Sequence, residues 1–266
     1  SDAGSGAAQT PAQTGSASQE SAPAQTGTAD AAFKIALVKQ LDHASMDEIA
    51  GAVTARLDEI AAETGTPIEY ELFSGQNDQT VLTQIGSQVM AEGYSAVIPI
   101  GTLAAQMMVV SAEESQTPVI FAAVSDPAYN DLTGIDYLTG TSDALDTAFI
   151  MDMMLAQNPQ VTNVGLLYSL SETNSATPIA EAKAYLDEKG ISYTEMTANT
   201  NDEVIAAASS LIAAGVDAVF TPTDNVIMAA ELAIAGDLAQ AGIPHYTGAD
   251  SFVRNGAFAT CGVNYT

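Results

Sequence analysis

A duplicated order of apolar runs and polar breaks constrains this chain more than any other feature. From Ala96 to Pro127, an apolar run ends at Gly101-Thr102, an Ala/Met-rich segment follows, and a second apolar run ends at Ser125-Asp126-Pro127. Residues 218–251 repeat this order around the polar break Thr223-Asp224-Asn225. Parallel strands need a helical crossover, and strands buried on both faces are apolar throughout. The pattern therefore predicts strand, loop, helix, strand and loop, written twice.

The repeat also extends upstream of both copies. Residues 75–97 parallel residues 198–219, and the apolar run 33–38 parallels 163–169. This length exceeds the period of 20 to 50 residues that is typical of solenoids. It predicts an α/β protein of two doubly wound parallel-sheet lobes joined by a hinge. Open α/β sheets bind ligands at the carboxyl ends of their strands, so we expect the polar breaks of the two lobes to face each other.

The predicted boundaries place the first lobe at 33–141 and the second at 142–258, with a helix after the crossing that is capped by Ser142 or Asp143. Residues 259–266 are predicted as a strand that returns to the first lobe. The chain stops there without a following helix, and we expect a C-terminal segment to be absent from this sequence. Residues 1–32 hold no aromatic or branched aliphatic side chain, so they are predicted to be a disordered tether.

Charge and motif content narrow the functional classes. The chain carries 33 acidic against 6 basic residues, a net charge of −27, which argues against nucleic acid, anionic membrane surfaces and polyphosphate ligands. A zwitterionic ligand is compatible with it. There is no GxGxxG after a strand, no P-loop and no GxSxG, and His43 and His245 lack metal-ligand spacing. Cys261 has no basic neighbour to activate it. We therefore predict no enzyme, no cofactor and no metal site.

Several short motifs occur in one order along residues 34–265. They are GQNDQ (75–79), TLAAQ (102–106), VSDP (124–127), LTGTSD (138–143), YSLSETNS (168–175), PTDN (222–225), GAFAT (256–260) and GVNY (262–265). Together they resemble the tryptophan/tyrosine-type substrate-binding lipoproteins of bacterial ABC importers, which adopt the type I periplasmic-binding-protein fold. That family normally continues with a helix that packs on the first lobe, and this sequence stops before it.

The resemblance implies that the chain captures tyrosine, tryptophan or phenylalanine between its lobes by hinge closure and delivers it to the permease of an importer. It also implies a monomer on the cell surface, outside the cytoplasm, that contacts the membrane only through a lipid anchor before the tether. Three alternatives stay open: a protein of the same fold for a purine nucleoside or a thiamine precursor, a surface sensor or adhesin that retains the pocket, and an enzyme on a doubly wound sheet. A transcription regulator with these lobes would need a basic helix-turn-helix at the N-terminus, which residues 1–32 do not supply.

An amino acid presents a carboxylate and an ammonium group, and each needs a partner once water is expelled. Helix starts favour carboxylates, which indicates the segments 102–104 and 171–175. The ammonium needs an acceptor, preferably ionised. Asp224 ranks first for this role because Thr223 and Asn225 flank it. The predicted ligand-binding residues are Asp42, Thr102, Leu103, Ala104, Ser125, Asp126, Ser171, Glu172, Asn174, Ser175, Thr223, Asp224, Asn225 and Asp250. Helix capping is the competing role for an Asp or Ser before a helix.

Overall fold

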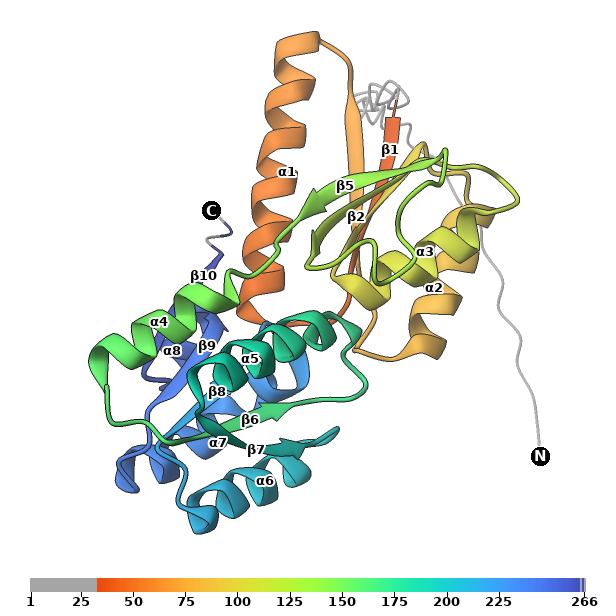
Figure 1. Ribbon diagram of the computed structural model, residues 1–266. Coiled ribbons are helices and arrows are strands. Elements are labelled where there is room, and N and C mark those ends of the chain that lie inside the picture. The colour runs from red at the N-terminus through yellow and green to blue at the C-terminus, as the bar shows by residue number, and fades with distance from the viewer. Residues whose placement is uncertain (1–32, 264, 266) are drawn as a thin grey trace, which may run out of the picture. The chain divides into compact units, whose positions relative to one another are not determined.

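The computed structural model describes residues 33–263 and 265, so the predicted tether at 1–32 lies outside the described residues (Figure 1). The first lobe consists of β1 (Phe33–Lys39), α1 (Ala44–Thr64), β2 (Ile68–Ser74), α2 (Gln79–Ala91), β3 (Ala96–Ile100), α3 (Thr102–Ala112), β4 (Val119–Val124) and β5 (Leu138–Ser142). The second lobe consists of α4 (Thr147–Gln157), β6 (Asn163–Tyr168), η1 (Thr173–Ser175), α5 (Ala176–Lys189), β7 (Ser192–Thr197), α6 (Asn201–Ala214), β8 (Ala218–Thr221), α7 (Asn225–Gln240), β9 (His245–Ala249), α8 (Asp250–Arg254) and β10 (Ala259–Val263).

The two sheets have the same topology. The first has the strand order β2-β1-β3-β4-β5, and the second has the order β7-β6-β8-β9-β10. All neighbouring strands are parallel. The predicted fold class, two α/β lobes with parallel sheets, is therefore confirmed, and the sequence repeat corresponds to a repeated strand order.

The last strand corrects one prediction. Residues 259–266 were expected to return to the first lobe, but β10 pairs with β9 and completes the second sheet. The repeat explains this placement, because β10 occupies in the second sheet the position that β5 occupies in the first. Beyond β10, Tyr265 packs on a first-lobe cluster that contains Met46, Ile49 and Ile100. The chain therefore reaches the first lobe only after its fifth strand, at Tyr265.

A second correction concerns the start of α4. Its N-cap is Asp146, whose side chain accepts from the amide of Phe149 at 3.0 Å, in place of the expected Ser142 or Asp143. Ser142 ends β5, and Asp143 lies in the crossing between the lobes. This leaves the Asp143 carboxylate free of the capping role.

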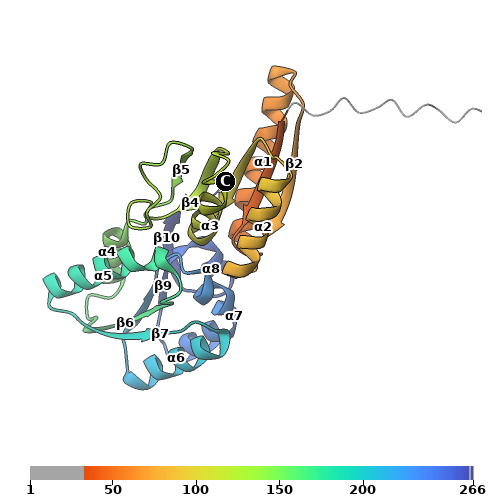
Figure 2. The ribbon, with the colours of Figure 1, turned by 90° about the vertical axis from the view of Figure 1, so that its right-hand side faces the viewer.

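Both faces of each sheet are covered. In the first lobe, α2 and α3 build a large apolar core on one face, and α1 covers a smaller area of the other face with Met46, Ile49 and Ala50 (Figure 1). In the second lobe, α6 and α7 pack on one face and α4 and α5 on the other (Figure 2). The strands are correspondingly apolar along their buried lengths, as in the segment Ile35–Val38 of β1. Helices on both faces leave the ends of the strands as the accessible edges of each sheet.

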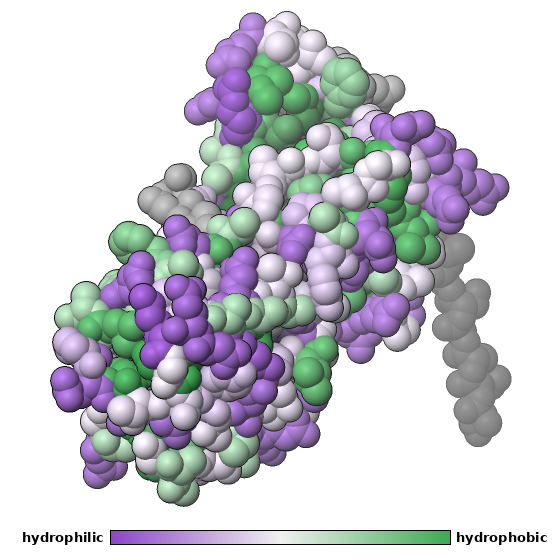
Figure 3. Space-filling model, viewed as in Figure 1, coloured by the Kyte–Doolittle hydropathy of each residue, from purple (hydrophilic) through white to green (hydrophobic). Residues whose placement is uncertain are grey.

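On the viewed surface, hydrophobic residues form separate areas between hydrophilic ones (Figure 3). The exposed large apolar side chains come from many elements and include Leu72, Val110, Leu170 and Leu232. Within residues 33–263 and 265, no helix combines the length and apolar character needed to cross a membrane.

Candidate functional site

The ends of the strands in both lobes border one small cavity of about 20 Å³. Its lining residues come from the loops and helix starts that follow these strands. They are His43, Ser45, Met46, Ile49, Gly101, Thr102, Ala123, Ser125, Asp143, Asn174, Thr223, Asn225, Met228, Ala249 and Tyr265. A volume of this size holds about one water molecule. An amino acid could enter only if the lining residues or the lobes moved apart.

The start of α3 forms the first-lobe wall of the cavity. Gly101 has a φ of +99°, and a Cβ atom there would lie 2.7 Å from Oε1 of Gln40, so both backbone conformation and space require glycine. Oε1 of Gln40 accepts a hydrogen bond from the Leu103 amide at 3.0 Å. Thr102, which is 3% exposed, faces the cavity at the positive end of the helix.

The start of α1 forms a second wall. His43 caps this helix, and its Nδ1 accepts from the amide of Met46 at 3.4 Å. Ser45 follows in the first turn and is 3% exposed, yet its Oγ has no hydrogen-bond partner in the described part of the chain. A buried hydroxyl without a partner is costly, and here it lines a cavity at a helix N-terminus. These are the properties of a binding position for an anionic group.

Asp143 supplies a carboxylate that faces the cavity. It is 7% exposed and lies in the crossing from β5 to α4. Its Oδ1 accepts from Oγ of Ser125 at 2.9 Å, and its Oδ2 accepts from the phenol of Tyr265 at 2.7 Å. Each carboxylate oxygen can accept a second hydrogen bond. Asp143 can therefore accept from a cationic group in the cavity while both hydroxyls stay in place.

Asp224 is also buried, but its oxygens are occupied within the second lobe. It caps α7 by accepting from the amide of Ile227 at 3.0 Å, and its other oxygen accepts from the Ser169 amide at 2.8 Å and from Oγ of Ser175 at 2.7 Å. Burial raises the pKa of the Asp224 carboxyl to about 6, against the hydrogen bonds that lower it. Asp224 does not line the cavity. Its surroundings correspond to the capping role.

Glu172 connects the lobes by hydrogen bonds. Its Oε1 accepts from Nε2 of Gln40 in the first lobe at 3.2 Å, and its Oε2 accepts from Nδ2 of Asn225 at 2.7 Å. Oδ1 of Asn225 in turn lies 2.9 Å from Nε2 of His43 in the first lobe. Burial, followed by the charge of Asp224, raises the pKa of Glu172 to about 7. Burial lowers the pKa of His43 below its usual range.

The other predicted residues divide into three groups. Thr102, Ser125, Asn174, Thr223 and Asn225 line the cavity together. Leu103, Ser175 and Glu172 lie behind this lining and contact it by hydrogen bonds.

The third group lies elsewhere. Ala104 belongs to the first-lobe core, and Ser171 is exposed. Asp42 pairs with Lys39 at 2.6 Å, and Asp250 pairs with Arg254 at 2.6 Å. Asp126 accepts from Thr177 of the second lobe at 2.7 Å, beside a separate cavity of about 380 Å³.

Comparisons with known proteins agree with this geometry. The family model described as ABC transporter substrate binding protein matches residues 34–266. The chain belongs to this family of substrate-binding proteins. It is 25% identical to a tyrosine-binding protein of Clostridioides difficile over 236 residues, which is 87% of this chain and 68% of the relative.

Solved structures of substrate-binding proteins share the fold. The ABC domain in complex with L-Trp from Streptococcus pneumonia aligns with a TM-score of 0.80 at 26% identity, over 88% of this chain and 79% of that one. A ligand-free, open substrate-binding protein with adhesive properties from Clostridium difficile aligns with a TM-score of 0.63 at 24% identity, over 88% of this chain and 80% of that one.

Four residues of this substrate-binding protein at the cavity or its wall escaped the sequence prediction: Gln40, Ser45, Asp143 and Tyr265. Gln40 directly follows β1, and Asp143 directly follows β5, so the rule that ligands bind at strand ends could have found both. Tyr265 follows β10 as Asp143 follows β5, which the repeat could have indicated. No signal marked Ser45, because its distinguishing property is a missing partner.

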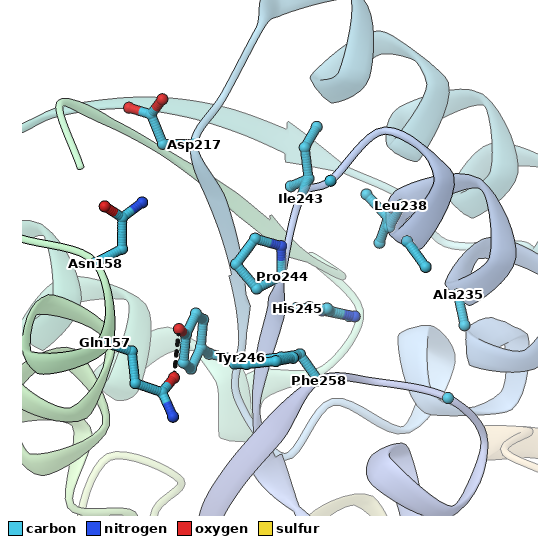
Figure 4. Close-up of a pocket in the computed structure, with 13 residues that line it drawn as sticks. Gln157, Asn158, Asp217, Ala235, Leu238, Ile243, Pro244, His245, Tyr246 and Phe258 are labelled. Carbon is cyan, nitrogen blue, oxygen red and sulfur yellow. Dashed lines mark hydrogen bonds between the residues drawn. The ribbon is translucent and has the colours of Figure 1, made fainter. Parts of the chain in front are cut away.

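A larger cavity, of about 500 Å³, lies within the second lobe (Figure 4). Leu238, Ile243, Pro244 and Phe258 line it, and the phenol of Tyr246 donates to Oε1 of Gln157 at 2.7 Å. This cavity borders the start of β9 and the end of α7, away from the helix N-termini that favour a carboxylate. The cavity between the lobes is therefore the better candidate for an amino-acid site.

Proposed function

We propose that this substrate-binding protein captures an aromatic amino acid in the cavity between its lobes and delivers it to the permease of an ABC importer. One observation carries the choice of an amino acid: the buried Ser45 hydroxyl without a partner and the Asp143 carboxylate line the same cavity. The printed names of two relatives, one binding tyrosine and one in complex with L-Trp, support an aromatic side chain.

In this proposal, the ligand carboxylate binds at the starts of α1 and α3, next to Ser45 and Thr102. The helix field there favours an anion by about 0.3 to 2 kcal/mol. The ammonium binds Asp143, and charge-assisted hydrogen bonds of this kind contribute about 1.5 to 3 kcal/mol. This assignment replaces Asp224, because its oxygens already accept from three donors of its own lobe.

The aromatic ring would lie among apolar side chains of both lobes. Met46 and Ile49 come from α1, Met228 comes from α7, and the ring of Tyr265 packs beside α1. Methionine adapts its shape to aromatic surfaces. Binding requires opening of the lobes and displacement of side chains such as Tyr265, since the cavity holds about one water. A ligand that touches both lobes can then stabilise the closed state, whereas a ligand that touches one lobe cannot.

We also propose that the protein acts outside the cytoplasm as a monomer, with residues 1–32 as the tether to a lipid anchor. The composition of this segment supports the tether, since nothing in it could form a packed core.

Thermal-shift screening tests the ligand class. We expect L-Tyr, L-Trp or L-Phe to raise the melting temperature, with D-enantiomers as matched controls that place the ammonium away from Asp143. Stabilisation by a purine nucleoside or a thiamine precursor, together with no shift from any aromatic amino acid, would overturn the substrate class.

A further inference from the structure

Glu172 and His43 are held by the two ends of one amide. Oδ1 of Asn225 can only accept, so Nε2 of His43 donates to it across 2.9 Å. Nδ2 of the same amide donates to Oε2 of Glu172 across 2.7 Å. His43 belongs to the first lobe, and the other two residues belong to the second. The carboxyl and the imidazole thus lose water together when the lobes meet.

We propose that Glu172, Asn225 and His43 form a latch between the lobes that closes with a neutral imidazole and a protonated carboxyl, so that closing moves one proton from His43 to Glu172. This inference rests on the proposed function for its ligand-based test. It predicts a binding affinity that changes little with pH in the intact protein, because one group loses the proton that the other gains.

The protonation of each group follows from its surroundings. Nδ1 of His43 accepts from the Met46 amide, which leaves no room for a proton on that nitrogen. Lys39 of β1 disfavours a charged imidazole, Asp47 of α1 favours it, and burial has the largest effect and keeps it neutral. Asp143 lines the same cavity as His43.

Glu172 faces the carboxylate of Asp224 from the same lobe and only uncharged amides from the first lobe, those of Gln40 and Asn77. Burial beside another carboxylate favours the protonated carboxyl. The hydrogen bonds printed for Asp224 all come from its own lobe, so they persist when the lobes separate. The change on opening therefore falls mainly on Glu172, whose Oε1 loses Gln40 and gains water.

The two single variants should respond to pH with opposite signs. In Glu172→Gln, only the imidazole changes its proton on closing, so a His43 that is protonated in the open state must lose that proton, and acid opposes binding. We expect the affinity to weaken roughly tenfold from pH 7.5 to pH 5.5. In His43→Gln, only the carboxyl takes up a proton, and the affinity should strengthen by about ten- to twentyfold over the same range. The intact protein should stay within about threefold.

Isothermal titration calorimetry with L-Tyr or L-Trp measures this directly, in pairs of buffers with different ionisation enthalpies. Binding should release protons in Glu172→Gln and take them up in His43→Gln. Asp126→Asn is the matched control, because Asp126 also contacts the other lobe, through Thr177, but has its pKa lowered by that hydrogen bond. This variant should keep the pH profile of the intact protein. Equal pH profiles in the intact protein and both latch variants would overturn the proposal.

The latch also has a test without ligand. Small-angle scattering of the ligand-free protein should show Glu172→Gln expanding and His43→Gln contracting as the pH falls from 7.5 to 5.5. If no aromatic amino acid binds at any pH, the proposed function fails, and the scattering alone decides whether the latch exists. A radius of gyration that does not change with pH in either variant would then overturn the latch as well.

Discussion

Asp143 and Asp224 are two buried carboxylates that follow strands of the repeat, and they differ in which groups occupy their oxygens. Asp224 accepts from two backbone amides and one serine hydroxyl of its own lobe. Asp143 accepts from two hydroxyls, and it lines the cavity between the lobes. The first carboxylate therefore stabilises a helix start, and the second remains able to accept from a ligand. Burial alone does not distinguish these roles.

The largest effect should come from Asp224→Ala, and it should fall on stability. The substitution leaves the amides of Ser169 and Ile227 and the hydroxyl of Ser175 buried without an acceptor. Each costs about 1 to 3 kcal/mol, so we expect the free energy of unfolding to fall by about 3 to 5 kcal/mol in urea denaturation. The matched control is Asp146→Ala, an exposed cap of α4, which should cost about 1 kcal/mol. If Asp224→Ala folds with unchanged stability and loses amino-acid binding, the two carboxylates have the opposite roles.

Asp143→Asn should show the reverse pattern, with a loss in binding and little change in folding. The amide keeps the shape of the side chain and an acceptor oxygen, but it removes the charge that faces the ligand ammonium. We expect the dissociation constant for L-Tyr or L-Trp to rise about ten- to a hundredfold, which corresponds to about 1.5 to 3 kcal/mol. Calorimetry measures this change. Asp250→Asn, at an exposed position outside the cavity, should change the affinity less than about twofold.

Ser45→Ala tests the opposite end of the ligand. Loss of one hydrogen bond to the ligand carboxylate should weaken binding by about threefold to tenfold, or about 0.5 to 1.5 kcal/mol. Because the hydroxyl has no partner within the described residues, the free energy of unfolding should not fall. Ser111→Ala is a suitable control, since this helical serine bonds Met107 within α3. A variant Ser45→Ala that loses stability and keeps its affinity would refute the assignment.

The lobes themselves were predictable from sequence for a definite reason. Apolar strands separated by helices form parallel sheets, and the copies at 96–127 and 218–251 produce the same strand order in each lobe. The rule of strand ends also found Thr102, Ser125, Thr223 and Asn225, which line one cavity.

The roles of individual side chains were not predictable in this way, because they depend on partners distant in sequence. The Ser169 amide that occupies Asp224 lies 55 residues away, and the Gln40 amide that reaches Glu172 lies 132 residues away. The position of β10 failed for a related reason. A short polar strand such as ATCGV can extend either sheet, and only the observed pairing with β9 decides between them.

The smallest effect should come from Arg254→Ala, at an ion pair between the lobes that is exposed where the Glu172 contacts are buried. Arg254 of α8 lies 3.3 Å from Glu48 of α1, and its side chain is 52% exposed. Exposed pairs contribute about 0 to 1 kcal/mol and are screened by salt. We therefore expect the affinity to change less than about threefold at low ionic strength and not at all in about 0.5 M salt, where the Debye length is only a few Å. Calorimetry at two salt concentrations measures both values. A loss above tenfold that persists in salt would mean that the exposed contact, rather than the buried amide network, holds the closed lobes together.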